Sequence, residues 1–405
     1  MASETVVITG IGLVTPIGVG KEVVWAGLLA GKSGFAPVES FDTSRYNVSV
    51  GAEVRGFDPA ASLVRLDPAR VGRASQLAIA GAWLAVADAG LALDALDRER
   101  VAVAMGTTSG EPREVERYND LLLGNALGEV GAEFSERYPC HRIAAQVAEE
   151  LGLLGPTMML PTACAAGNYA IAHACDLLLA GRADQALAGG ADAFSRITYT
   201  GFAKLGAIAP DLCRPFDKGR QGMIPGEGAG ILVLERMSEA QKRGARIYAQ
   251  VAGYGLSCDA HHMTAAHPEG LGPARAMERA LRSSGLTPED IDYVSAHGTG
   301  TPTNDKLETL AVQRVFGAKP KVPVTSIKSM LGHTMGAASA IEAAVCALAI
   351  TDGAIPPTMN FREADPDCDL DCVPNEARQT RVDVAMNNAY AFGGNNASVI
   401  LRRAS

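Results

Sequence analysis

The sequence feature that most constrains the fold is a pair of internal similarities with nearly equal offsets. The segment from Gly226 to Arg236 resembles the segment from Gly393 to Arg403, which lies 167 residues further on. The segment that begins at Cys164 resembles the one that begins at His333, 169 residues further on. These offsets predict a duplicated chain in which each half supplies a strand, a turn and a helix. Chance similarity between alanine-rich helices is the alternative.

Short β-branched runs alternate with longer apolar segments along the whole chain, and this alternation predicts an α/β fold. Hydrophobic residues make up 47% of the 405 residues, and the 44 glycines are scattered, which suits a protein with many turns. The duplication predicts two halves, residues 1–245 and 246–405. The expected strands include Thr5–Thr9, Val101–Met105, Asp184–Gly190, Ile231–Leu234, Ile247–Ala252, Tyr293–Ala296, Val322–Ser326, Val382–Asn387 and Ala397–Leu401. The expected helices include Val23–Ala30, Ala74–Ala89, Arg142–Leu151, Gly272–Ser284, Thr303–Phe316 and Ala337–Ile350.

Charge and cysteine usage exclude several classes of protein. The net charge of −9 argues against general nucleic-acid binding, although a local basic patch for an acidic partner remains compatible with it. The eight cysteines form no Cys-x-x-Cys pair, and no secretory segment follows Met1, so they are expected to be free thiols in the cytoplasm. No long uninterrupted apolar stretch predicts a membrane span.

The segment Pro161-Thr-Ala-Cys164-Ala-Ala-Gly-Asn contains the first candidate for a catalytic residue. The run Thr157–Leu160 before it is predicted to be a buried strand, and the run Tyr169–Leu179 after it a buried helix. A cysteine at a helix N-terminus has its thiolate stabilised by unpaired N–H groups, so its pKa is expected to fall. The alternative is a structural buried cysteine, which is common.

Three other segments have weaker interpretations. The glycines between Gly10 and Gly18 follow a strand and suggest a turn, but their spacing with Pro16 is a poor match to a dinucleotide-binding motif. The polar segment Glu111–Cys140 is predicted to be an irregular excursion from the core. The cluster Cys258–His262 fits no common zinc pattern, so no metal site is predicted.

Four segments together resemble the signature motifs of β-ketoacyl-acyl carrier protein synthases. They are PTACAAG at Cys164, SAHGTGTPTND at His297, SIKSMLGHTMGAAS at Lys328 and His333, and NAYAFGGNNAS at Phe392. The similarity is greatest to elongating type II synthases of fatty acid synthesis and to their relatives in polyketide assembly. The resemblance implies a duplicated thiolase-type fold with five layers, α-β-α-β-α, and a dimer.

The resemblance also implies a decarboxylative Claisen condensation between a carrier-bound acyl chain and malonyl-acyl carrier protein. Cys164 is expected to carry the acyl chain as a thioester, since a thiolate is a strong nucleophile. His297 and His333 are expected to stabilise the enolate by donating hydrogen bonds from Nε2. Lys328 is expected to pair with a carboxylate, and Glu308 matches the family carboxylate.

The remaining residues implied by the resemblance concern substrate binding. The backbone N–H groups of Cys164 and Phe392 are expected to form an oxyanion hole, and Phe392 to gate the acyl pocket. Thr299 and Thr301 match hydroxyls that contact the phosphopantetheine arm, and Thr264 belongs to a segment near the same channel. Thr107 and Thr108 lie where relatives often carry a bulky aliphatic residue that limits the acyl pocket.

Some positions depart from the family pattern. Ala391 replaces the usual first glycine of the gate, Asn395 replaces a common threonine, and the segment Tyr138–Arg142 differs from the usual tunnel wall. Together with Thr107 and Thr108, these differences suggest a non-standard acyl chain, such as a polyene or polyketide intermediate.

The expected partners are acyl carrier protein and either a second copy of the chain or a chain-length-factor subunit. No cofactor of the protein's own is expected, because the substrates are carried on the phosphopantetheine of the carrier. Two alternatives stay open: a non-catalytic chain-length-factor-like subunit and a coenzyme A thiolase. A thiolase would be expected to carry a second cysteine in the last motif, where this chain has Phe392-Gly-Gly-Asn.

Overall fold

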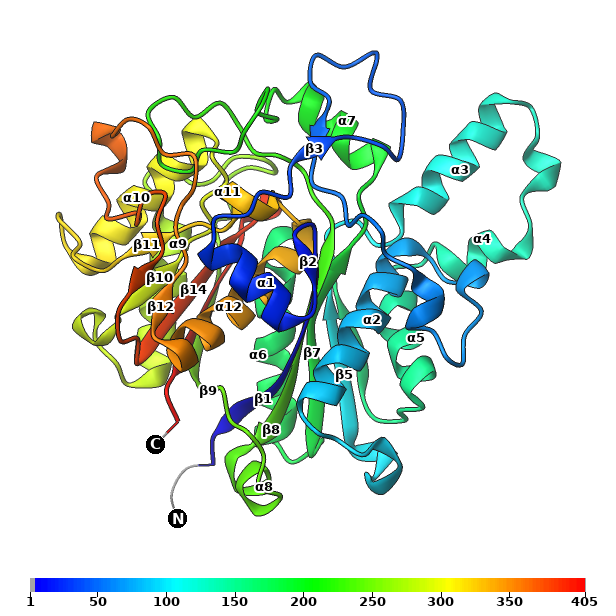
Figure 1. Cartoon of the computed structure of the whole chain (residues 1–405), viewed down its shortest axis with the longest axis horizontal. Helices are drawn as coiled ribbons and strands as arrows, with labels where there is room; N and C mark the ends of the chain where they lie inside the picture. Colours follow the sequence, from blue (N-terminus) through cyan, green and yellow to red (C-terminus); the bar gives the residue numbers. More distant parts are fainter. Residues whose placement is uncertain (1–3, 405) are drawn as a thin grey trace.

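The computed structural model describes residues 4–404 and shows one large sheet made of two similar parts (Figure 1). The first part has the strand order β6–β5–β7–β8–β1, and the second has the order β11–β10–β14–β15–β9. Strand β1 pairs with β9 and so joins the two parts. The first-part bounds are β1 (Val6–Thr15), β5 (Val101–Gly106), β6 (Thr157–Leu160), β7 (Gln185–Asp192) and β8 (Gly228–Arg236). The second-part bounds are β9 (Ala249–Cys258), β10 (Tyr293–Ser295), β11 (Val324–Thr325), β14 (Val384–Tyr390) and β15 (Asn395–Arg402).

Strand direction repeats together with strand order. In the first part β5 is parallel to β6 and β7, whereas β8 is antiparallel to β7 and β1. In the second part β10 is parallel to β11 and β14, whereas β15 is antiparallel to β14 and β9. This agreement confirms the predicted duplicated α/β fold. The predicted boundary between residues 245 and 246 falls between α8 (Met237–Lys242) and β9, and its position remains a prediction.

The helices form three layers around the two parts of the sheet (Figure 1). Helices α6 and α12 lie in the middle and contact strands of both parts, while four further helices cover the two outer faces. The five layers therefore alternate helix, sheet, helix, sheet and helix, as the resemblance implied. The bounds are α2 (Arg73–Asp88) and α5 (Arg142–Leu151) on the first outer face, α6 (Ala166–Leu179) and α12 (Ala338–Asp352) in the middle, and α9 (Leu271–Ser284) and α10 (Pro302–Phe316) on the second outer face.

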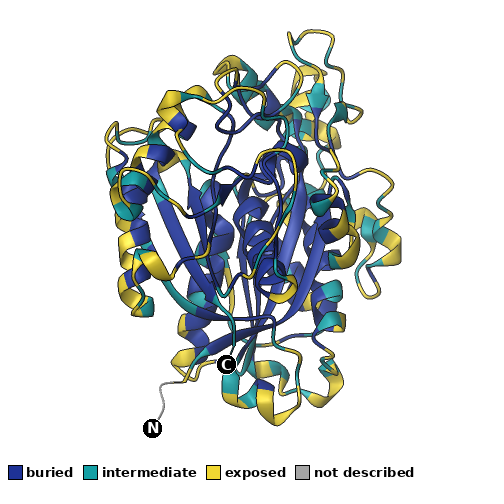
Figure 2. Cartoon of the chain, turned by 60° about the vertical axis from the view of Figure 1, so that its left-hand side comes forward, coloured by how far each residue is buried: buried dark blue, intermediate teal, exposed yellow. Residues whose placement is uncertain are grey.

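The central layer is the most deeply buried part of the molecule (Figure 2). Every residue of α12 from Ala338 to Ile350 is buried, and the helix packs in one apolar core with α6. The stretch 335–352 is long and apolar enough to cross a membrane by composition, but 89% of it is buried inside the protein. It is therefore accounted for as the core helix of this fold.

Strand β1 corrects the prediction of a glycine-rich turn after Thr9. The strand continues to Thr15, and its glycines face the backbone of α2. A Cβ atom at Gly10 would lie 2.2 Å from the carbonyl oxygen of Ala85, and one at Gly12 would lie 1.9 Å from that of Gly81. These glycines are present because the helix crosses the strand closely, so the predicted turn after Thr9 is wrong.

Two further expectations differ from the structure. The segment Glu111–Cys140 is largely helical, with α3 (Pro112–Leu123) and α4 (Ala132–Arg137) forming an arm that projects from the body (Figure 1). Helix α7 (Arg196–Lys204) follows β7. Strand β6 is not buried, since it is an edge strand whose Met158 is 46% exposed. The composition of Glu111–Cys140 and of Thr157–Leu160 did not reveal that one face of each of these segments lies in solvent.

The register of the repeat also differs from the prediction at the helix starts. A short 3₁₀ turn precedes each central helix: Ala163–Ala165 before α6 and Met335–Ala337 before α12. The first residue of each turn has positive φ, 52° at Ala163 and 54° at Met335. The equivalent of Cys164 is therefore Gly336, at an offset of 172 rather than 169, and His333 lies at the position of Pro161.

The remaining elements complete the connections between the layers. They are α1 (Lys21–Leu29), α11 (Lys328–Leu331), β2 (Gly18–Val19), β3 (Ala36–Pro37), β4 (Val50–Gly51), β12 (Ala354–Ile355) and β13 (Arg378–Gln379).

Candidate active site

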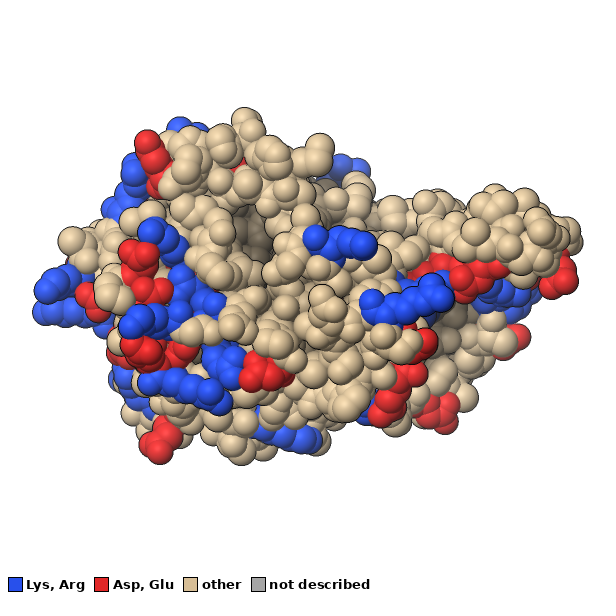
Figure 3. Space-filling model, turned by 90° about the horizontal axis from the view of Figure 1, so that it is seen from above, with Lys and Arg blue, Asp and Glu red and all other residues tan. Residues whose placement is uncertain are grey.

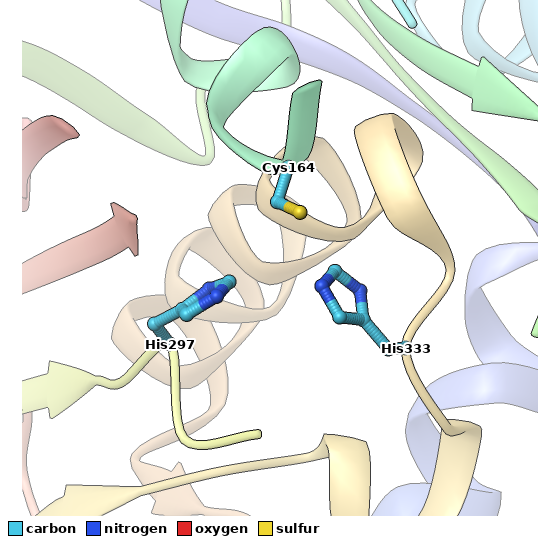
Figure 4. A group of neighbouring side chains, drawn as sticks. All are labelled: Cys164, His297 and His333. Atoms are coloured by element: carbon cyan, nitrogen blue, oxygen red, sulfur yellow. The ribbon is translucent and has the colours of Figure 1, made fainter. Parts of the chain in front are cut away.

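Cys164 lies in the 3₁₀ turn between the edge strand β6 and helix α6. The preceding residue, Ala163, adopts a left-handed conformation that costs a residue with a Cβ roughly 1–2 kcal/mol. Ala165 and Ala166 follow, and all three residues from 164 to 166 are buried. This strained turn aims the Cys164 side chain away from the helix and towards the second half of the molecule (Figure 4). A strained backbone at such a junction is typical of a functional position.

The two predicted histidines meet this cysteine from the second half. His297 follows β10, and His333 follows the short helix α11 (Figure 4). The Cys164 sulfur and one ring nitrogen of each histidine all lie within 4.8 Å of one another. The imidazole centroids are 5.4 Å apart with the rings nearly perpendicular, at 83°. The structure therefore brings together the three residues that the sequence proposed as a set.

The protonation state of Cys164 differs from the prediction of a lowered pKa. Burial raises the pKa of the Cys164 thiol to about 12, and the charge of Lys328 opposes this effect without cancelling it. Because Cys164 is only 7% exposed, little water is available to solvate a thiolate. The resting site therefore holds a neutral thiol at neutral pH.

Both histidines are neutral as well. Burial lowers the pKa of His297 and that of His333 well below the usual value, and the charge of Lys328 acts in the same direction. The backbone N–H of Met335 donates a hydrogen bond to Nδ1 of His333 at 3.2 Å. A neutral imidazole that accepts at Nδ1 carries its proton on Nε2, so His333 can donate from Nε2 into the site.

Lys328 has a different carboxylate partner from the expected one. It forms a buried ion pair with Glu342 of α12, and each residue is 1% exposed. Glu308 instead accepts hydrogen bonds from the backbone N–H groups of His297 and Gly298, at 2.8 and 2.7 Å. Glu308 thus holds the loop that carries His297. Burial raises the pKa of both carboxyl groups to about 7.

A cavity of roughly 360 Å³ contains the three side chains and opens on the face shown in Figure 3. Four predicted substrate-binding residues line it, namely Thr264, Thr299, Thr301 and Phe392. The hydroxyls of Thr299 and Thr301 lie 3.0 Å apart on one wall. This is the arrangement expected for a channel that receives a polar arm.

Phe392 lies at the exposed end of this cavity. Its side chain is 43% exposed, and its ring centroid is 5.9 Å from that of Phe202 on α7. The positive φ values of the gate belong to Gly393 and Gly394, whereas Ala391 is extended with φ −131°. Alanine at position 391 is therefore compatible with this conformation of the loop. The oxyanion hole of the Cys164 and Phe392 N–H groups remains a prediction.

Thr107 and Thr108 are not among the described residues that line the cavity. The hydroxyl of Thr107 donates to Asp192 at 2.8 Å, and the backbone N–H of Thr108 donates to the same carboxylate at 2.7 Å. Asp192 also accepts a hydrogen bond from the backbone N–H of Gly336 at 2.6 Å. These threonines therefore help to fix the turn before α12, and contact with an acyl chain stays a prediction for them.

The sequence prediction missed three buried polar residues at the site. Glu342 is the single charged residue within the apolar segment 338–350, and this isolation was a signal that could have revealed it. Asp192 terminates β7 without a distinctive motif, and Tyr390 terminates β14 inside the gate motif. Tyr390 packs edge-on against His297, with ring centroids 5.8 Å apart.

Cys164, His297 and His333 also have the composition of a metal-binding set. A tetrahedral zinc ion with bonds of about 2.0–2.3 Å needs donor atoms roughly 3.5 Å apart, so these side chains need little movement to bind one. The absence of a metal from the working protein therefore stays a prediction.

Comparison with known proteins gives consistent matches over most of the chain. Residues 3–240 match the family described as β-ketoacyl synthase, N-terminal domain, and residues 248–362 match the β-ketoacyl synthase, C-terminal domain. The 3-oxoacyl-[acyl-carrier-protein] synthase 2 of Coxiella burnetii is 40% identical, over 100% of this chain and 99% of the relative.

Two solved structures show how closely the fold agrees. "The ishigamide ketosynthase/chain length factor" is 45% identical, with a TM-score of 0.97 and full coverage of both chains. The structure titled "AntDE:AntF (apo): type II PKS acyl-carrier protein in complex with its ketosynthase bound to the hexaketide" is 32% identical, with a TM-score of 0.91 over 99% of this chain and 100% of that chain.

Proposed function

Since this chain belongs to the β-ketoacyl synthase family, we propose that it elongates acyl chains in fatty acid or polyketide synthesis by decarboxylative Claisen condensation. It is an acyltransferase that uses a carrier-bound acyl chain and malonyl-acyl carrier protein. The observation that carries this proposal is the convergence of one thiol and two neutral imidazoles in one cavity.

The first half-reaction transfers the acyl chain to Cys164. The sulfur attacks the thioester carbonyl, the new sulfur–carbon bond forms, and the bond to the phosphopantetheine sulfur breaks. The thiol proton ends on the departing phosphopantetheine sulfur. Because the resting thiol is protonated, loss of this proton accompanies the attack. The N–H groups of Cys164 and Phe392 are the proposed donors to the carbonyl oxygen that becomes negative.

The second half-reaction consumes the malonyl group. The bond to its carboxylate breaks, CO₂ leaves, and the negative charge moves to the thioester oxygen as an enolate. His333 and His297 donate hydrogen bonds from Nε2 to this oxygen, and their neutral state suits them to donate without a net charge. The enolate carbon then attacks the acyl carbonyl, the bond to the Cys164 sulfur breaks, and that sulfur takes up one proton from solvent water.

The proposed partners are acyl carrier protein and either a second copy of this chain or a chain-length-factor subunit. The titles of the two similar structures name a chain length factor and an acyl-carrier protein as components of those assemblies. On the face into which the cavity opens, Lys and Arg side chains gather beside the hollow (Figure 3). Such a surface suits an acidic carrier. A cytoplasmic location is part of the proposal.

Intact-mass measurement tests the proposal directly. After incubation with an acyl carrier protein loaded with a short acyl chain, the wild-type protein is expected to gain the mass of that acyl group. Cys164→Ala is expected to gain no mass and to lose condensation by at least about 10⁴-fold. Cys175→Ala is a matched control, because Cys175 is a buried free cysteine on α6 that the described cavity lining does not include.

Each alternative predicts a distinct result in the same assay. A non-catalytic partner subunit would gain no acyl mass in the wild-type form. A coenzyme A thiolase would gain the mass but release no CO₂ when the second substrate is added. Either result would overturn the proposed condensation.

A further inference from the structure

Tyr390 carries an unused hydrogen-bonding group beside the active-site cavity. The residue ends β14, lines the cavity and is 5% exposed. Within residues 4–404 its buried hydroxyl has no hydrogen-bond partner. A buried donor left in this state costs about 1–3 kcal/mol, so a tyrosine here calls for an explanation that phenylalanine would not need.

His297 also has a polar side-chain atom without a hydrogen-bond partner. Its Nδ1 is buried and, among the described residues, has no hydrogen-bond partner. The corresponding nitrogen of His333 accepts the backbone N–H of Met335. The two histidines therefore differ in how the chain fixes their tautomer, although both are expected to donate from Nε2.

The two unsatisfied groups belong to adjacent rings. The Tyr390 and His297 centroids are 5.8 Å apart with the rings at 63°, and both residues line the same cavity. Burial raises the pKa of Tyr390 well above its usual value and lowers that of His297 well below its own. The phenol is therefore a donor and the imidazole has an acceptor nitrogen throughout the neutral range. Neither atom exposes surface to the cavity, so the hydroxyl and Nδ1 can satisfy each other only directly, after rotation of one or both side chains.

We propose that Tyr390 is a positioning residue for His297: its hydroxyl rotates to donate directly to Nδ1 and keeps the ring proton on Nε2. This inference rests on the proposed function, because only enolate stabilisation requires the Nε2 proton. The side chain thus does for His297 what the Met335 backbone does for His333. A partner that fixes the tautomer commonly changes activity by about 10–100-fold when it is removed.

The test compares Tyr390→Phe with wild type by ¹⁵N NMR of labelled histidine side chains. The chain has seven histidines, and the spectrum of His297→Ala identifies the signals of His297. In wild type the His297 signals are expected to report an Nε2–H tautomer. In Tyr390→Phe they are expected to shift towards a mixture of the two tautomers, while those of His333 stay unchanged.

Activity gives a second readout, because a general structural defect would slow acylation and CO₂ release alike. In Tyr390→Phe, CO₂ release from malonyl carrier protein by the acylated enzyme is expected to fall about tenfold. Acylation of Cys164 should stay within about twofold. Tyr248→Phe is the control, because it removes another buried phenol hydroxyl, bonded to Asp88 at 2.9 Å, outside the cavity lining.

An unchanged His297 tautomer in Tyr390→Phe would overturn the inference, whatever happens to the rate. A slower decarboxylation with an unchanged tautomer would mean that the hydroxyl contacts the substrate itself. The NMR measurement needs no turnover, so an inactive wild type would defeat the proposed function without deciding the tautomer of His297.

Discussion

The turn at Cys164 and its counterpart at Gly336 share one backbone but differ in chemistry. Each is a short 3₁₀ turn that begins with a residue of positive φ and leads into a buried central helix. In the first copy the second position holds Cys164, the proposed nucleophile. In the second copy it holds Gly336, and the proposed catalytic residue of that segment, His333, lies three residues earlier.

The glycine explains why the second copy differs. A Cβ atom at Gly336 would lie 2.6 Å from the backbone nitrogen of Thr108 and 2.7 Å from a carboxylate oxygen of Asp192. The loop after β5 occupies the space into which a side chain would project. Duplication therefore preserved the turn as a scaffold, while packing decided which copy could present a side chain to the cavity.

Among the variants near the second turn, the one that removes the cation Lys328 is expected to reduce the free energy of unfolding the most. Lys328→Met leaves the Glu342 carboxylate buried without its partner, which typically costs about 3–5 kcal/mol in the free energy of unfolding. Urea unfolding measures this loss, and the double variant Lys328→Met/Glu342→Leu is expected to regain most of it. A single variant as stable as the double would contradict the expectation.

The same substitution also tests whether the charge of Lys328 lowers the pKa values of His297 and His333. After burial, the charge of Lys328 is the next cause that lowers the pKa of His297 and of His333. Removing the charge moves both pKa values up towards the usual value, so the imidazoles become protonated at a higher pH. The acid limb of CO₂ release is therefore expected to lie at higher pH in Lys328→Met than in wild type.

The comparison of the two turns also shows what the sequence could and could not predict. The hydrophobic period and the length of each segment predicted the strands and helices, because β-branched runs favour strands and alanine-rich segments favour helices. The offset of 169 was wrong because it aligned the similar residues of Cys164–Gly167 and His333–Gly336, whereas the backbone aligns Thr162 with Thr334. Two segments can carry related chemistry without occupying equivalent positions.

Properties that depend on burial were less accessible to sequence reasoning. The helix N-terminus suggested a low pKa for Cys164, but desolvation raises that pKa to about 12. The glycines of β1 suggested a turn because close approach by α2 leaves the same residue type in a strand. The partner of Lys328 lay in a helix 14 residues away, where a single glutamate interrupts an apolar run.

Asp192 joins the loop after β5 to the turn before α12, and its ionisation is expected to have the next largest effect. The carboxylate accepts hydrogen bonds from Thr107, Thr108, Ser109 and Gly336, yet burial raises its pKa to about 6 from an ordinary 3.8. A raised pKa in the folded state means that the stability contribution present below pH about 4 is lost as the pH rises through about 6.

Asp192→Asn removes this titration while it keeps the size of the side chain. The stability of wild type minus that of Asp192→Asn is expected to fall by about 3 kcal/mol between pH 4 and pH 7, as a shift of about two pKa units implies. Urea unfolding at both pH values measures the difference. Stability curves that stay parallel across this range would show that Asp192 does not change its charge there.

Gly336→Ala is expected to have the smallest effect, and it tests the comparison itself. The added methyl group meets backbone and a fixed carboxylate rather than a flexible side chain, so overpacking is expected to cost about 1–3 kcal/mol. Gly128→Ala is the matched control, because a Cβ there meets nothing within 4 Å among the described residues. Thermal unfolding of the two variants measures the difference. If Gly336→Ala were as stable as Gly128→Ala, the turn before α12 would have room for a side chain. The absence of a nucleophile from the second turn would then need a cause other than packing.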